Sequence, residues 1–143
     1  GGPLKSQLNE QIEASGLGGK VRLMGYLTDQ EVAAYFGACD IFCMSSVYAT
    51  EAFGIVQIEA MSAGKPVVAT KIPGSGVSWV NEHKGSGVNV KPKDSEALAK
   101  AFRHILESPD TYTSYSEQAS QRYWTMFTKT KMIEKCIEIY KNL

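Results

Sequence analysis

Two glutamates, Glu51 and Glu59, stand eight positions apart on either side of the start of an apolar segment. Phe53-Gly54-Ile55 lies between them, and Gly64 ends the segment. The start of a helix binds anions through its free backbone N–H groups, and carboxylates accept hydrogen bonds from hydroxyl groups. This combination is suited to a phosphorylated sugar, because amides can hold its diphosphate or sugar oxygens while carboxylates hold its hydroxyls.

The placement of the two carboxylates also has simpler explanations. If both glutamates were helical, they would lie about 80° apart around the axis and flank one side of the element. Glu59 has mostly apolar neighbours, so we expect a partly buried carboxylate, which is rare unless function requires it. The alternatives are that Glu51 caps the helix and that Glu59 makes a structural hydrogen bond.

The order of the motifs resembles a known family. The run from Glu51 to Met61, followed by Gly-Lys-Pro-Val-Val-Ala-Thr at 64–70, is similar to the signature of the retaining "group 1" glycosyltransferases, which have the two-domain GT-B fold. Upstream, residues 2–4 resemble the family's Gly-Pro turn, 21–27 its next strand and loop, and 40–42 the strand after that.

The resemblance extends from residue 1 to about residue 102, and it implies roles for individual residues. Glu51 would contact the transferred sugar at the reaction centre, and Glu59 would bind the ribose hydroxyls of the nucleotide. Phe53, Gly54 and Ile55 would offer amides to the sugar and diphosphate. The remaining residues expected to bind the donor are Gly2, Tyr26, Leu27, Ser75 and Gly76.

The loop that contains Ser75 departs from the family pattern. Many relatives have Gly-Gly there and a glutamate shortly afterwards, whereas this chain has Ser75, Trp79 and Val80. This difference leaves open the role of the loop in sugar specificity. The run at 76–81 is similar to that of bacterial members that build cell-surface polysaccharides.

The implied reaction is retaining transfer of a sugar from a UDP- or GDP-sugar to an acceptor hydroxyl of a glycan or glycolipid. Such enzymes need no metal, and the departing phosphate deprotonates the acceptor on the front face. Two alternatives remain: a nucleotide-sugar epimerase of similar fold and a non-catalytic α/β binding domain. Glu51 and Glu59 with the strand at 66–70 fit the transferase pattern better than the epimerase pattern.

Composition excludes several other classes of protein. Fifteen basic residues balance fifteen acidic ones, so the chain has no net positive charge that would attract nucleic acid. No apolar run approaches the ~18 residues of a membrane span. Neither His83 nor His104 has a partner at metal-ligand spacing, so we predict no metal site. The spacing of the three cysteines, Cys39, Cys43 and Cys136, suggests no disulfide, so we interpret them as reduced core thiols of a cytoplasmic protein. For the full-length enzyme, peripheral association with the inner face of the membrane is left open.

Strand-like and helix-like segments alternate along the chain, which predicts an α/β fold with a doubly wound parallel sheet flanked by helices, the Rossmann-like half of a GT-B fold. The expected strands are 20–25, 41–44, 66–70 and 86–91. The expected helices are 4–16, 29–39, the helix of the 51–59 element, which ends at about 63, 94–108, 109–125 and 128–142. Thr28 to Glu31 is expected to form a capping box at the start of the helix at 29–39, and Asp94 is expected to cap the helix at 94–108. The last two helices are extra C-terminal elements, and Tyr123, Trp124 and Phe127 are predicted to form an aromatic core cluster between them.

The resemblance further implies that residues 1–143 are a partial C-terminal donor-binding domain. The family has two more strands before the Gly-Pro turn, in the middle of the sheet, together with basic residues that hold the diphosphate. Strand 21–24 is therefore not expected to pair with 41–44. We also expect an N-terminal acceptor domain in the full-length enzyme and no activity of the isolated chain. We further expect either dimerisation through exposed strand edges or a natural chain that is longer than these 143 residues.

Overall fold

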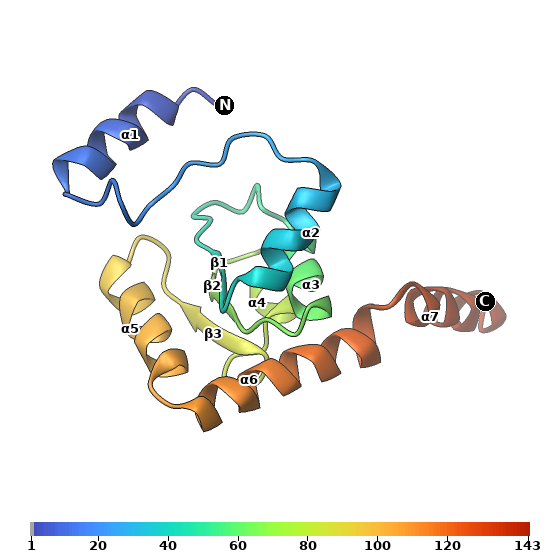
Figure 1. Cartoon of the computed structure of the whole chain (residues 1–143). Coiled ribbons are helices and arrows are strands. Elements are labelled where there is room, and N and C mark those ends of the chain that lie inside the picture. Colours follow the sequence, from blue (N-terminus) through green and yellow to red (C-terminus); the bar gives the residue numbers. More distant parts are fainter. Residues whose placement is uncertain (1) are drawn as a thin grey trace. The chain divides into compact units, whose positions relative to one another are not determined.

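The computed structural model describes residues 2–143, so Gly1 of the expected Gly-Gly-Pro turn lies outside the described residues (Figure 1). The chain divides into two units, Gly1–Tyr35 and Phe36–Leu143, and each is described by itself. Across the described part of the chain, none of the helices combines the length and the hydropathy that crossing a bilayer requires.

The first unit contains helix α1 (Lys5–Ala14) and most of helix α2 (Asp29–Ala38). Gly16 ends α1 with a φ of 66°, and its N–H donates to the carbonyl of Glu13 while Leu17 N–H donates to Ile12, as in a Schellman motif. The capping box predicted at the start of α2 is confirmed: Thr28 N–H donates to the Glu31 carboxylate over 2.8 Å, and Glu31 N–H donates to the Thr28 hydroxyl.

The strand predicted at 20–25 is wrong, because residues 21–25 have no strand conformation in the structure. The side chains of Val21, Leu23 and Met24 are all exposed. A strand needs a neighbouring strand that pairs with its N–H and C=O groups, and the described residues of this unit include no other strand.

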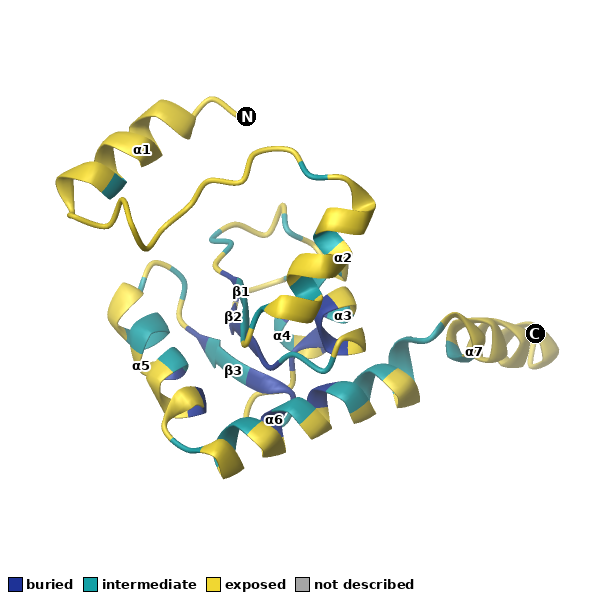
Figure 2. Cartoon of the chain, viewed as in Figure 1, coloured by how far each residue is buried: buried dark blue, intermediate teal, exposed yellow. Residues whose placement is uncertain are grey.

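The second unit contains a sheet of three parallel strands in the order β1 (Phe42–Met44), β2 (Val67–Thr70) and β3 (Gly87–Val90). Cys43 is opposite Val68, and Ala69 is opposite Asn89. The predicted neighbour order and parallel direction are confirmed. All four residues of β2 are buried, as expected for the central strand of a sheet covered on both faces (Figure 2).

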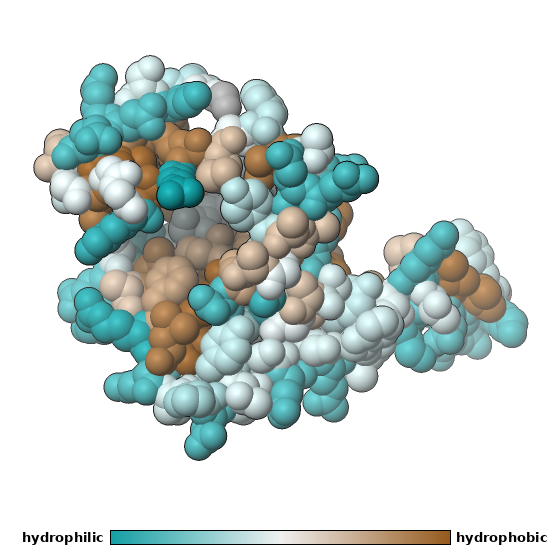
Figure 3. All heavy atoms as spheres, in the orientation of Figure 1, coloured by the Kyte–Doolittle hydropathy of each residue, from teal (hydrophilic) through white to brown (hydrophobic). Residues whose placement is uncertain are grey.

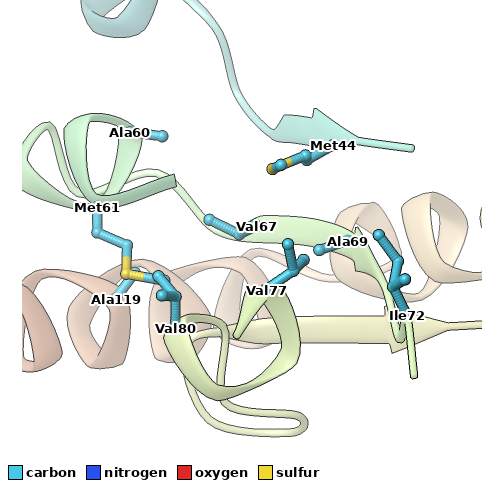
Figure 4. Close-up of a cluster of buried hydrophobic side chains, with 9 residues drawn as sticks. All are labelled: Met44, Ala60, Met61, Val67, Ala69, Ile72, Val77, Val80 and Ala119. Atoms are coloured by element: carbon cyan, nitrogen blue, oxygen red, sulfur yellow. The ribbon is translucent and has the colours of Figure 1, made fainter. Parts of the chain in front are cut away.

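Helices cover the two faces of this sheet. They are α3 (Ile55–Ser62), α4 (Val77–Val80), α5 (Ser95–Leu106) and α6 (Pro109–Arg122). The chain continues in a π-helical turn, η1 (Tyr123–Phe127), and in α7 (Lys129–Lys141), which buries none of its residues. Val67 and Ala69 of β2 pack with residues of α3, α4 and α6, including Met61, Val77 and Ala119 (Figure 4). Val68 faces the other way and packs with Ile105 of α5 and Tyr115 of α6. This alternation follows from the two-residue period of a strand.

The C-terminal helices are more exposed than the sequence predicted. Trp124 is 63% exposed, and the interpretation of it as a core residue is wrong, whereas Tyr123 and Phe127 are partly buried against the core. Apolar residues of α7 reach the surface beside charged ones (Figure 3). Cys136 on this helix is exposed, so the interpretation of it as a core thiol is wrong, whereas Cys39 and Cys43 are half-buried.

Candidate functional site

Most of the predicted site residues of the second unit lie in two loops at the carboxyl ends of adjacent strands, whereas Ile55 and Glu59 lie on helix α3. Residues 45–54 connect β1 to α3, and residues 71–76 connect β2 to α4. In open parallel α/β sheets, ligands bind in the crevice outside the carboxyl ends of the strands. The sheet therefore places these two loops where a ligand site is expected.

The turn into α3 is built around Gly54. Gly54 has a left-handed conformation with φ 76° and ψ 59°. A Cβ atom at this position would lie 2.7 Å from Gln57 Nε2 and 2.8 Å from the Met44 side chain. The left-handed conformation therefore favours glycine, and any larger residue would also have to displace the ends of the Gln57 and Met44 side chains. Gly54 is the N-cap of α3, so the first amides of the helix follow it directly.

Those first amides are free to bind a ligand. Within residues 2–143, the N–H groups of Ile55 and Val56 make no backbone hydrogen bond, as is normal for the first turn of a helix. Ile55 is 66% exposed and Phe53 is 37% exposed. Gly54, between these two exposed residues, is itself buried, and the unpaired amides of Ile55 and Val56 lie at the positively polarised end of α3.

Glu51 lies in a turn whose N–H donates to the carbonyl of Tyr48 over 3.1 Å. The N-cap of α3 is Gly54, and no side chain caps this helix, so the interpretation of Glu51 as a cap is wrong. Glu51 is half-buried, and none of the ion pairs among the described residues involves it. Its carboxylate is therefore available to a ligand.

Glu59 lies on α3 but is exposed, so the expectation of a partly buried carboxylate is wrong. The reason is the helical period: Gln57, Ala60 and Met61 form the buried face of α3, and Glu59 lies outside it. Its backbone carbonyl accepts from the Ser62 hydroxyl over 2.7 Å. No ion pair of the described chain involves Glu59 either.

Ser75 and Gly76 use their polar groups inside the protein. The Ser75 hydroxyl donates to the carbonyl of Glu51 over 2.5 Å and accepts from Val77 N–H over 3.2 Å. Gly76 N–H donates to the carbonyl of Ala52 over 2.7 Å. The structure therefore shows these two residues joining the loop after β2 to the loop after β1.

The sequence did not indicate Gln57, whose side chain is fully buried beneath the Gly54 turn. Its Nε2 donates to the carbonyls of Phe53 over 3.3 Å, Gly54 over 3.5 Å and Val77 over 3.3 Å. Its Oε1 is buried and has no partner among the described residues. The available signal was a second polar residue in the apolar segment, two positions before Glu59.

Arg122, at the end of α6, was also missed. Its Nε donates to the carbonyl of Val80 over 2.9 Å and its Nη2 to that of Trp79 over 2.6 Å, while Nη1 pairs with Glu82. The Trp79 ring contacts Phe53, with 5.9 Å between centroids, and also contacts Phe127, with 5.6 Å. Arg122 and these rings therefore support α4 and the edge of the Gly54 turn.

The three predicted site residues of the first unit are Gly2, Tyr26 and Leu27; Tyr26 and Leu27 directly follow Gly25. Gly2 and Gly25 line a cavity of about 450 Å³ together with Leu8 and Met24. Tyr26 is 89% exposed and Leu27 is half-buried. Tyr26 therefore has an aromatic face available for stacking.

A separate cavity of about 250 Å³ lies at the carboxyl ends of the strands of the second unit and is lined by Ser45, Thr70, Lys91 and Lys93, among others. Lys93 also lies over the Tyr48 ring, 5.5 Å from its centroid. Neither predicted glutamate lines this cavity. Among residues 2–143, no cluster of His, Cys, Asp or Glu side chains is arranged to hold a metal ion.

Comparison with known families gives a match over most of the chain. The model of the family described as "Glycosyl transferases group 1" matches residues 1–122. The chain is 32% identical over 143 residues to O-antigen chain mannosyltransferase C of Escherichia coli, covering 100% of this chain and 38% of that protein. It is 32% identical over 127 residues to D-rhamnosyltransferase WbpZ of Pseudomonas aeruginosa, covering 89% of this chain and 33% of that protein. The chain thus spans about a third of the length of the curated relatives it matches.

Solved structures share the fold. The chain superposes on Anabaena Alr3699/HepE in complex with UDP with a TM-score of 0.85 and 29% identity, covering 96% of this chain and 36% of that one. Sucrose-phosphate synthase from Thermosynechococcus elongatus gives a TM-score of 0.85 at 26% identity, and the superposition covers 99% of this chain and 34% of that one. The C-terminal domain of a Francisella tularensis group 1 family protein, LpcC, shares the fold with a TM-score of 0.78 at 22% identity. This superposition covers 88% of this chain and 63% of that one. The α/β fold class predicted from the sequence is confirmed.

Proposed function

Because the chain belongs to the Glycosyl transferases group 1 family, we propose that it forms the donor-binding part of an enzyme that transfers a sugar from a nucleotide-diphosphate sugar to an acceptor hydroxyl. The observation that carries this proposal is the Gly54 turn. It leads into the unpaired first amides of α3, and the segment that contains it carries two carboxylates, Glu51 and Glu59, that have no ion-pair partner among the described residues. Amides suit the phosphate or sugar oxygens of a donor, and carboxylates suit its hydroxyls.

Each carboxylate has its own proposed role. Glu59 accepts hydrogen bonds from the ribose hydroxyls, and its exposure on α3 supports this role because a ligand can reach it. Glu51 lies on the other side of Gly54 and contacts the transferred sugar. Phe53, Gly54 and Ile55 supply backbone contacts to the sugar and the diphosphate.

The other predicted donor-binding residues divide into two groups. Gly2, Tyr26 and Leu27 are proposed to contact the nucleotide, with the exposed Tyr26 ring stacking on the base. Ser75 and Gly76 are proposed to act indirectly, since their hydroxyl and N–H hold the Glu51 and Ala52 carbonyls. They therefore keep Glu51 in place rather than bind the sugar through those groups.

The proposed reaction retains the configuration of the sugar. The bond from the anomeric carbon to the diphosphate breaks, the acceptor oxygen bonds to that carbon on the same face, and the acceptor proton passes to a departing phosphate oxygen. Backbone N–H groups at the start of α3 would stabilise the negative charge that develops on the diphosphate, so the proposal requires no metal ion.

The donor is proposed to be a UDP- or GDP-sugar, and the acceptor a glycan or glycolipid of a bacterial surface polysaccharide. The names of the two relatives, an O-antigen chain mannosyltransferase and a D-rhamnosyltransferase, support this class of product. A solved neighbour, Alr3699/HepE, has been crystallised with UDP-glucose, at a TM-score of 0.81 and 27% identity. We propose that a further domain binds the acceptor, because the matched relatives are much longer than this chain, and that the enzyme works in the cytoplasm, where its free thiols stay reduced.

The test uses the full-length protein that carries this segment and a panel of UDP- and GDP-sugars without acceptor. We expect slow hydrolysis of one donor, measured as released nucleotide diphosphate, and a slower rate in the Glu51→Gln variant. Conversion of one nucleotide sugar into another without release of nucleotide would indicate an epimerase. A protein that neither binds nor hydrolyses any member of the panel would contradict the proposal.

A further inference from the structure

We propose that Gln57 is a positioning residue for donor binding: it orients the peptide planes of the Gly54 turn so that the N–H groups of Gly54 and Ile55 face the ligand. This inference rests on the function proposed above. Gln57 does not touch the donor itself, because its side chain is fully buried under the turn.

The contacts of Gln57 converge on the backbone of the turn. One amide nitrogen, Nε2, donates to the carbonyls of Phe53 and Gly54 in the turn and to the carbonyl of Val77 in α4. An amide group has two N–H donors, so at least one of them is shared between two acceptors. The backbone N–H of Gln57 also donates to the Gly54 carbonyl over 2.9 Å. The carbonyls on both sides of Gly54 are therefore held toward the interior.

This arrangement determines where the neighbouring N–H groups point. A trans peptide unit is planar, and its C=O and N–H point in opposite directions. When the Phe53 carbonyl points to Gln57, the Gly54 N–H points away from it. For the same reason, the inward Gly54 carbonyl turns the Ile55 N–H outward. The Gln57 side chain thus acts mainly on the direction of the Gly54 N–H, through the Phe53 carbonyl, and it adds to the backbone N–H of Gln57 in fixing the direction of the Ile55 N–H.

Two successive donors in this conformation form an anion-binding concavity. Gly54 is left-handed and Ile55 begins a right-handed helix, and consecutive residues of opposite hand direct their N–H groups to a common point. The Ile55 N–H makes no other backbone hydrogen bond among the described residues. The ligand chemistry that fits is an anionic oxygen, such as a phosphate oxygen of the donor.

The unpartnered Oε1 supports a positioning role. Burying a polar atom without a partner costs free energy, and the hydrogen bonds of Nε2 to three carbonyls offset that cost. The bond to Val77 also joins the turn to α4, which lies in the segment after β2.

The first test needs no variant: the full-length protein that carries this segment is titrated with UDP and with GDP, and its backbone amide signals are followed by NMR. We expect the amide signals of Gly54 and Ile55 to shift as one of these nucleotides binds. We expect smaller shifts with the corresponding nucleoside, which lacks the phosphates. Binding of a nucleotide that leaves both amide signals in place would overturn the proposal.

The second test compares Gln57→Met, which keeps length but removes the amide, with Ile105→Val, a core control in α5. Loss of the amide is expected to weaken UDP or GDP binding roughly 10- to 100-fold in calorimetry, without changing the affinity for the nucleoside. The control should leave both affinities unchanged. Gln57→Glu should also weaken binding at neutral pH and regain part of it on acidification, because a protonated carboxyl supplies one O–H donor.

The outcomes separate this inference from the function on which it rests. If the unmodified protein binds no nucleotide, the proposed function fails. If the unmodified protein binds and a folded Gln57→Met variant binds equally well, only the role of Gln57 fails. A parallel loss of nucleotide and nucleoside affinity would also overturn it, since that pattern indicates general damage to the fold.

Discussion

The side-chain hydroxyl of Ser75 donates a hydrogen bond to the backbone carbonyl of Glu51, across the two loops that follow β1 and β2. This bond connects a residue predicted to bind the donor with a residue predicted to act in catalysis, but through the backbone of the latter. Gly76 repeats the connection one residue later, to Ala52. The two loops are therefore held together by their own hydrogen bonds, without a ligand.

Ser75→Ala tests this connection between the loops. We expect a loss of about 0.5–1.5 kcal/mol in the free energy of unfolding, because the Glu51 carbonyl loses its donor. Urea denaturation followed by circular dichroism measures it. Ser62→Ala is the matched control, since that hydroxyl is exposed and bonds only within α3. Equal stability of the two variants would show that the link between the loops contributes nothing.

Arg122→Met is expected to destabilise the protein more. The guanidinium is largely buried, with 14% of the side chain exposed, and it donates to the last carbonyls of α4. Hydrogen bonds to a charged group contribute about 1.5–3 kcal/mol, which is the expected loss in unfolding free energy. Arg103→Met, at an exposed site on α5, should change stability by less than about 0.5 kcal/mol. Similar losses in both variants would contradict the proposed support of α4.

The features that could be predicted from the sequence are those set by local chemistry. The Thr28–Glu31 capping box and the Asp94 cap of α5 depend on residues three apart, and both form as expected. The parallel strands β1, β2 and β3 followed from apolar runs between helices. The strand at 20–25 failed because strand formation depends on a neighbour that local sequence does not supply.

Prediction of the candidate site is limited in the same way, by contacts with parts of the chain that are distant in sequence. Gly54 could be predicted because a glycine before a helix has a recognisable backbone role. Gln57 and Glu59 are both polar residues in an apolar segment, but they lie about 200° apart around α3, so only one can face the core. Which one does so depends on the packing of Met61 and Ala60 against β2 and α6, and the sequence pattern favoured the wrong residue.

Acidification should weaken the start of α2. The Thr28 N–H and then its hydroxyl hold the pKa of Glu31 below the ordinary glutamate value. The folded state thus favours the carboxylate, and this stabilisation is complete above the unfolded pKa, about 4.3, and is lost as pH falls through the lower folded pKa. An NMR titration of the Glu31 side chain should show a midpoint below that value. Thr28→Val should raise the midpoint; an unchanged midpoint would show that the hydroxyl does not contribute.

The three free cysteines should react at different rates with iodoacetamide. Cys136 is exposed on α7, whereas Cys39 and Cys43 are half-buried. Burial raises the pKa of the Cys43 and Cys39 thiols, which lowers their thiolate fraction at neutral pH. Mass spectrometry should therefore find Cys136 labelled first, and Cys136→Ser should remove the fast phase. In urea all three should react alike, and faster labelling of Cys43 than of Cys136 in the native protein would contradict the packing around β1.

The two glutamates of the candidate site should have separable effects on the full-length enzyme. Glu59→Gln is expected to weaken nucleotide binding, because the ribose hydroxyls lose a charged acceptor, whereas Glu51→Gln is expected mainly to slow sugar transfer. Loss of a hydrogen bond to a charged group corresponds to about 10- to 150-fold. Calorimetry with UDP and GDP measures the first effect, and the turnover number measures the second. Glu117→Gln, on the exposed side of α6, is the control and should change neither quantity. Unchanged nucleotide affinity in Glu59→Gln would count against the ribose assignment, and unchanged turnover in Glu51→Gln would remove Glu51 from the reaction centre.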